Sequence, residues 1–166
     1  MIMICYLILK NILIYVIMYL VKKIEQYDND DVFFCEPIKN NIMEQSSFIR
    51  IIYSNSIFIL NGIYLLITLN DITCEKYYTK YKCTFNITDN QDIIERIKNI
   101  EESILNKYSN TNKIKQLKIY DQFKNGNFKI FTDTGSKSIC SFILKVSGIW
   151  ETHNNYGLTY KFTKIS

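Results

Sequence analysis

The sequence predicts a mainly β domain of the α+β class, and three observations support that class. Apolar residues alternate with polar ones over several stretches, which is typical of half-buried strands. One stretch near residues 88–108 instead repeats isoleucine every three or four positions, which predicts one amphipathic helix. The chain has 166 residues, of which 48% are apolar and 22% charged, so one domain with a packed core is expected.

Residues 1–24 are predicted to form an apolar helix. The first 21 residues are almost continuously apolar, which is long enough to span a bilayer, although Lys10 lies near the centre. A membrane anchor is therefore one interpretation. The alternatives are a helix packed on the domain or on a second copy, and an AT-rich extension that precedes a working start at Met43.

Residues 25–46 are acidic and then polar, and they contain the only proline, so they predict a linker to a domain over residues 47–166. Strands are expected at residues 47–53 and 57–69, with Asn61-Gly62 as a bulge in the second. A third strand is expected at residues 75–88, with aromatic and basic residues on both faces.

The helix is expected to begin at a capping box formed by Thr88 and Gln91, with acidic residues in its first turns. One face carries an apolar stripe that we expect to be buried: Ile93, Ile94, Ile97, Ile100, Ile104 and Leu105.

Residues 112–131 are ambiguous between a helix and a hairpin, and Asn125-Gly126 favours the hairpin. Residues 141–165 predict two strands joined by a polar turn at residues 151–155. The alternation places Tyr156, Leu158, Tyr160 and Phe162 on the core face of this terminal hairpin. Three strands, a helix and two strands is the element order of an OB-like five-stranded barrel, in which the helix lies between the third and fourth strands.

The net charge of +4 is unevenly distributed. After residue 106 ten lysines stand against three acids, which gives that part a net charge of +7 and leaves −3 for the rest. A cationic surface suits a polyanion such as nucleic acid or an anionic membrane, although a solvated lysine-rich surface has the same composition.

The sequence spacing does not predict a cluster of residues suited to catalysis or metal binding. The acids fall in the linker or on the expected solvent face of the helix, and His153, the only histidine, lies in the expected turn. The five cysteines have no short metal-ligand spacing, which favours free thiols; a Cys74–Cys83 bridge is expected only in a secreted chain. We expect no enzyme activity, no metal and no cofactor.

The candidate ligand is instead single-stranded nucleic acid, because bases stack on aromatic rings while lysines contact phosphates. Trp150 is expected at the tip of the terminal hairpin, with Lys145 and Lys161 opposite the core face. The other candidate contacts are Tyr78, Lys80, Lys82 and Lys129.

Three segments, FILKVSGIWETHNNYGLTYKF, IRIIYSNSIFILNGIYLLITL and IEESILNKY, resemble the single-stranded-DNA-binding replication proteins of nucleocytoplasmic large DNA viruses. The resemblance spans residues 47–165 and is strongest over residues 148–151 and 157–161. It implies an OB-type domain that coats displaced DNA during viral replication or repair, as an oligomer, in the host cytoplasm or nucleus. The chain departs from this pattern by its apolar head and by lacking a long acidic C-terminal tail.

Two other functional hypotheses remain. One is a membrane-anchored protein, held by residues 1–21, whose small β domain makes protein–protein contacts. The other is a viral structural or scaffolding component that associates through sheet edges. For the first hypothesis, RNA is an alternative ligand to DNA.

Overall fold

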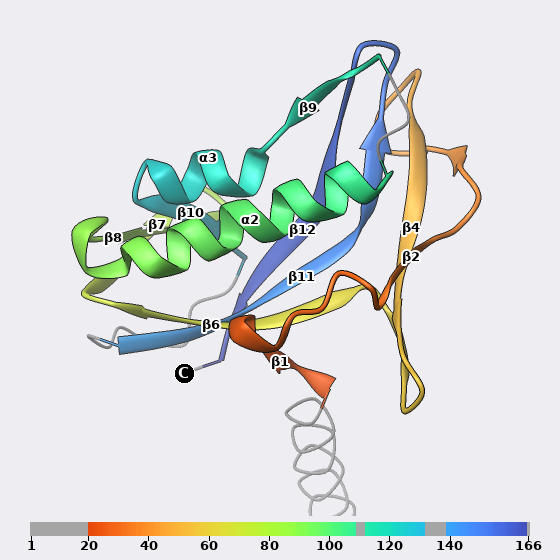
Figure 1. Ribbon diagram of the computed structural model, residues 1–166. Helices are drawn as coiled ribbons and strands as arrows, with labels where there is room; N and C mark the ends of the chain where they lie inside the picture. Colours follow the sequence, from red (N-terminus) through yellow and green to blue (C-terminus); the bar gives the residue numbers. More distant parts are fainter. Residues whose placement is uncertain (1–19, 109–111, 132–138, 166) are drawn as a thin grey trace, which may run out of the picture.

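The computed structural model describes residues 20–108, 112–131 and 139–165 (Figure 1). They form an open, mixed β-sheet with one long helix, which confirms the mainly β class. The strands are β1 (Lys22–Lys23), β2 (Val32–Phe34), β3 (Ile38–Lys39), β4 (Ser47–Ser54), β5 (Ile59–Asn61), β6 (Ile63–Asn70), β7 (Ile72–Tyr77), β8 (Lys80–Phe85), β9 (Ile114–Gln116), β10 (Asn127–Ile130), β11 (Ile139–Glu151) and β12 (Asn155–Lys164). The helices are α2 (Gln91–Tyr108), α3 (Lys118–Lys124) and two short 3-10 turns, η1 (Ile24–Gln26) and η2 (Thr88–Asn90).

The main path of the sheet runs β1-β6-β11-β12-β10-β8-β7. Its two ends, β1 and β7, do not pair with each other, so the expected closed five-stranded barrel is not shown. Strands β1, β9 and β10 pair in parallel with their neighbours β6, β12 and β12, and the other ladders are antiparallel. Both α2 and α3 cover the same face of the sheet, and the core lies between that face and the helices (Figure 1).

The N-terminal expectations need correction where the structure describes them. The predicted apolar helix lies mostly outside the described residues, and its expected end is the short strand β1 followed by η1. None of the described helices is long and apolar enough to cross a membrane. The predicted linker, residues 25–46, instead contributes β2 and β3 to β4, and Val32 is buried because it faces the core.

The terminal hairpin is confirmed as β11 and β12, which pair from Phe142–Lys164 to Glu151–Tyr156. On its other side, β11 pairs first with β6 and then with β4. The change of partner coincides with a bulge between Val146 and Gly148. From Phe142 to Glu151, β11 therefore has strands on both sides, and it fixes the register of three neighbours.

The predicted strand over residues 57–69 is divided at Gly62 into β5 and β6. Gly62 has a φ of 99°, and a Cβ there would lie 2.6 Å from the backbone oxygen of Val146. A glycine is needed because the chain turns in the left-handed region while passing close to β11. The Asn61-Gly62 pair therefore forms a corner between β5, which pairs with β4, and β6, which pairs with β11.

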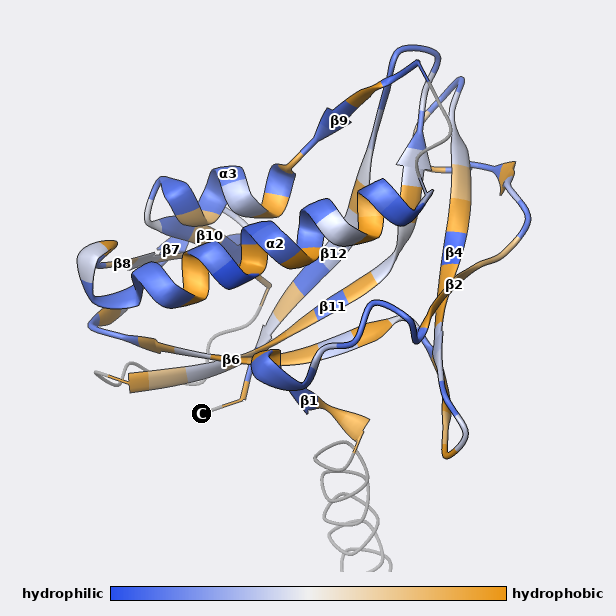
Figure 2. Cartoon of the chain, in the orientation of Figure 1, coloured by the Kyte–Doolittle hydropathy of each residue, from blue (hydrophilic) through white to orange (hydrophobic). Residues whose placement is uncertain are grey.

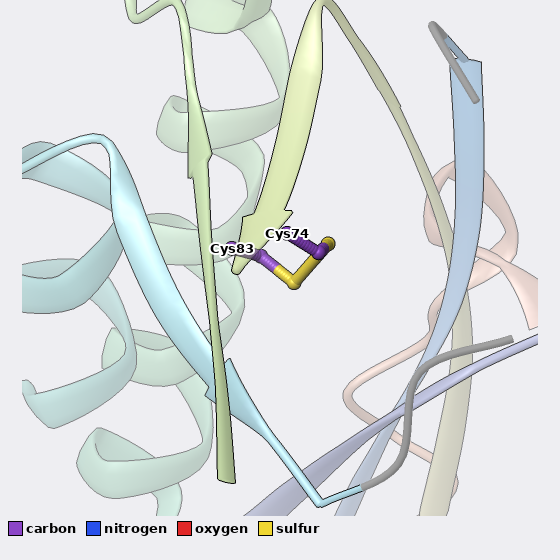
Figure 3. Close-up of a disulfide and its surroundings, with 2 residues drawn as sticks. All are labelled: Cys74 and Cys83. Atoms are coloured by element: carbon purple, nitrogen blue, oxygen red, sulfur yellow. A yellow bond between two sulfur atoms is a disulfide. The ribbon is translucent and has the colours of Figure 1, made fainter. Parts of the chain in front are cut away.

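The predicted single strand over residues 75–88 is in fact the hairpin β7–β8, which turns at Tyr78 with a φ of 55°. Cys74 and Cys83 are opposite each other in this ladder, with Cα atoms 4.1 Å apart, and form a disulfide (Figure 3). The expectation of free thiols is therefore wrong for this pair. The bridge joins the edge strand β7 to its single partner in the main path.

The long helix is confirmed as α2, but the 3-10 turn η2 stands in place of the predicted capping box at Thr88 and Gln91. The backbone N–H of Thr88 donates to the side-chain oxygen of Asn86 over 2.9 Å, and η2 leads into α2. Residues 118–124, expected in a hairpin arm, form the short helix α3. Its side chains Ile119 and Phe123, four residues apart, are buried in the core.

We expect Gly148→Ala to destabilise the fold strongly, because a Cβ there would lie 2.3 Å from the Ile49 backbone oxygen and 2.7 Å from the Phe48 ring. The expected loss in the free energy of unfolding is about 2 kcal/mol or more, measured by urea denaturation. The matched control is Ser147→Ala in the same bulge, for which a change below about 0.5 kcal/mol is expected. Equal losses for the two variants would contradict the close packing of β4 on β11.

Candidate nucleic-acid interface

The face of the sheet opposite the helices is built by the same alternation that builds the core. Along β12, Leu158 and Phe162 are buried toward the helices, while Thr159, Lys161 and Thr163 point to the other side. The helices α2 and α3 lie on the buried side only (Figure 1). We call the other side the helix-free face.

Four lysines form a row across four adjacent strands of the helix-free face. Lys145 on β11 is opposite Lys161 on β12, and Lys129 on β10 is opposite Lys82 on β8. The two pairs meet because the following residues, Ile130 and Phe162, pair in parallel. We call these residues the lysine row: Lys145, Lys161, Lys129 and Lys82.

The lysine row concentrates positive charge that few neighbouring groups compensate. Strands in a sheet lie about 4.8 Å apart, well within the screening length of about 8 Å at physiological salt, and like charges directly opposite are destabilising. Lys82 and Lys161 make no ion pair with any described side chain, and the charges of Lys129 and Lys145 lie 4.9 Å from the ring centres of Tyr77 and Tyr64. A bound polyanion would relieve this repulsion.

Aromatic and apolar side chains form a second row on the same face, nearer the end of the hairpin. Ile38 on β3, Phe48 on β4, Trp150 on β11 and Gly157 on β12 are successive cross-strand neighbours. The Trp150 ring covers Gly157, where a Cβ would lie 2.8 Å from the indole. Trp150 is thus half-buried inside β11, which corrects its expected place at the hairpin tip.

The two rows are connected by a groove where β12 and β10 diverge. These strands pair only at Ile130 and Phe162, and α3 closes the gap through a hydrogen bond between Gln122 and Tyr160. Two adjoining hollows of about 490 Å³ and 510 Å³ lie along the gap. Both are lined by Gln122, Asn127 and Tyr160; Trp150 lines the first, and Lys80, Lys129 and Lys161 line the second. We call this the interstrand groove.

A third hollow, of about 390 Å³, lies on the other side of Trp150 and is mostly apolar. It is enclosed by Phe48, Trp150, Thr159 and the segment 38–43. Trp150 therefore separates the interstrand groove from an apolar pocket, and its ring is accessible from both.

The structure brings together six of the seven predicted contact residues. The four lysines of the row, Lys80 and Trp150 all lie on the helix-free face or in the interstrand groove. Tyr78 does not join them, because it lies in the β7–β8 turn, is 83% exposed and contacts Tyr77 with its ring. Sequence reasoning missed side chains that also belong to this face or groove: Phe48, Arg50, Tyr64, Tyr77, Gln122, Phe131 and Tyr160.

Glu101, predicted on the solvent face of the helix, is buried instead. Glu101 is 1% exposed, and its two oxygens accept hydrogen bonds from the backbone N–H groups of Ile119 (3.1 Å) and Tyr120 (2.8 Å). Burial raises the pKa of Glu101 to about 7, although these two N–H groups favour the ionised form. Because both oxygens are occupied by the start of α3, the role of Glu101 is to hold α3 against α2.

The described residues contain no group of three or more His, Cys, Asp or Glu side chains that could hold a metal ion. The fold and the face together define a small α+β domain with an open sheet, one side of which is cationic and carries aromatic rings. Comparisons of this chain with protein-family models, with curated proteins and with solved structures find no match.

We expect stability to fall as the pH rises from about 4.5 to about 7. In this range folded Glu101 keeps a proton that an unfolded carboxyl, with a pKa of 4.5, has lost, so unfolding is favoured by at most about 1.4 kcal/mol per pH unit. Glu101→Gln stays neutral and keeps one acceptor oxygen, so urea denaturation at several pH values should show a flatter profile. Glu102→Gln on the same helix is the control; an unchanged profile for Glu101→Gln would refute this assignment.

Proposed function

We propose that this protein binds single-stranded nucleic acid, with DNA as the first candidate, along the helix-free face. The lysine row carries this proposal, because four cations in line across β11, β12, β10 and β8 suit a chain of phosphates. The base stacking and phosphate contacts expected from the sequence are therefore proposed for an open sheet, rather than for a closed OB barrel. A role in viral DNA replication or repair, as an oligomer, rests on the sequence resemblance.

The interstrand groove supports the proposal by offering a path from phosphate contacts to an aromatic surface. Lys161, Thr159 and Gly157 follow one another along β12 on the helix-free face, in steps of about 6.8 Å. A strand whose phosphates lie on the lysine row therefore has the Trp150 indole within about two nucleotides. Stacking on one such ring is worth roughly 1–3 kcal/mol and tolerates any base, which suits binding without sequence preference.

The first test removes charge from the lysine row. In the double variant Lys145→Gln/Lys161→Gln, the plot of log affinity against log salt concentration should become shallower by about 1.4, since each phosphate contact on a single strand contributes about 0.7. Fluorescence anisotropy of labelled oligo(dT) with the full chain between 20 and 200 mM salt measures this, and oligo(U) compares RNA with DNA.

The matched control for this variant is Lys98→Gln/Lys124→Gln. Both of these lysines lie over the Tyr120 ring on the helical side, so the change in net charge is the same but its place is not. Absence of binding at 50 mM salt, or an equal effect of the two double variants, would refute the proposal.

The second test uses Trp150, the only tryptophan in the chain, as a reporter. Addition of oligo(dT) should quench its fluorescence, because a base stacks against the indole. An abasic oligonucleotide of the same length keeps the phosphates but lacks the bases, so it should quench little and bind roughly 5- to 150-fold more weakly. Equal affinity for the two ligands, with no change in emission, would exclude Trp150 from the binding surface and leave only a phosphate contact.

A further inference from the structure

The hairpin between β4 and β5 ends in an exposed tip with two isoleucines, Ile57 and Ile59, which line neither hollow of the interstrand groove. Ile57 is 88% exposed and Ile59 is 75% exposed, while Phe58 between them packs against the core. No charged residue occurs from Ile51 to Asn70, and the end of the hairpin carries hydrophobic residues beside the polar turn Ser54-Asn55-Ser56 (Figure 2). Large exposed apolar side chains at a loop tip are typical of contacts with a partner or a membrane.

Several backbone groups of this tip have hydrogen-bond partners within the hairpin. The side-chain oxygen of Asn55 accepts from the N–H groups of Ile57 (2.9 Å) and Phe58 (3.3 Å), and the Asn55 N–H donates to the Phe58 carbonyl over 3.0 Å. The Asn55 amide donates in turn to Asp31. These backbone groups therefore do not need water, which is a condition for entering a medium of low polarity.

The tip lies beside the point where the apolar N-terminal sequence ends. Lys22 follows the run of residues 1–21 directly, and its ammonium group lies 5.0 Å from the ring centres of both Tyr53 and Phe58. It also forms an ion pair with Asp31 over 3.3 Å, so the acid nearest the hairpin is neutralised. β1 and the β4–β5 hairpin lie at the same end of the molecule (Figure 1).

We propose that Ile57 and Ile59 insert into the surface of a lipid bilayer, next to the membrane segment that the sequence predicts at residues 1–21. Lys22 directly follows that segment and contacts the hairpin, so a membrane segment that ends there and the tip would meet the bilayer on one side of the domain. The lysine ammonium is then at headgroup level, where cations beside an apolar segment are favoured. The insertion is shallow, about 5–10 Å, as for other interfacial apolar elements.

The test places a tryptophan reporter at the tip of the full-length chain. In a Trp150→Phe background, Ile57→Trp is compared with Ile42→Trp, whose parent side chain is 99% exposed in the segment before β4 and therefore at the other end of that strand. Each chain is reconstituted in phosphatidylcholine–phosphatidylglycerol vesicles, either plain or with bromine near the top of the acyl chains. We expect strong quenching by bromine for Ile57→Trp and little for Ile42→Trp, with bromine near the chain end quenching less.

Three results would overturn the proposal. The first is a chain that does not float with the vesicles. The second is a chain that floats while neither reporter, or both equally, is quenched. The third is a reporter at residue 57 whose emission shifts to the blue without quenching, which would mean that another part of this chain or a second copy covers the tip.

Discussion

The pairing of β11 with two different strands along one edge is the constraint on which the rest of the molecule depends. β6 occupies the first part of that edge and β4 the last, so the chain must leave one ladder and enter another within a few residues. The bulge before Gly148 and the corner at Gly62 meet at this point, where neither position has space for a side chain. Beyond this point β4 leaves β11 and pairs with β2 and β5.

The same constraint determines the chemistry of the helix-free face. The pairing of β11 with β12 places Lys145 opposite Lys161, and the bulge after Val146 places Trp150 on the same face, opposite Gly157, four residues before Lys161 on β12. Aligning like charges costs stability in the free protein, while stacking and phosphate contacts would recover it on binding. In a sheet selected only for stability, opposite charges would face each other across neighbouring strands. Glu75 on β7 faces Lys82 in this way at the end of the row.

The terminal hairpin and α2 could be predicted because β12 keeps one period over 10 residues and α2 over 18. The turn at Tyr78 could not, since a tyrosine in the left-handed region has no local signal. Nor could α3, whose start depends on a carboxylate supplied from α2 by Glu101. The sequence indicated which lysines and aromatic residues could form the candidate site. It could not predict that Lys129 lies beside Lys161, because this depends on a single long-range bridge between β10 and β12 that no local pattern encodes.

The two proposed surfaces are related through β4. Phe48, near its start, is the neighbour of Trp150, while the strand ends at Ser54, just before the tip with Ile57 and Ile59. Eight residues in extended conformation separate these ends by about 23 Å, which is more than a Debye length at physiological salt. A bilayer at the tip would therefore repel a bound nucleic acid only weakly, so the two proposed ligands would not exclude each other through charge. In that arrangement the rigid strand β4, rather than a flexible linker, sets the distance between the membrane and the bound strand.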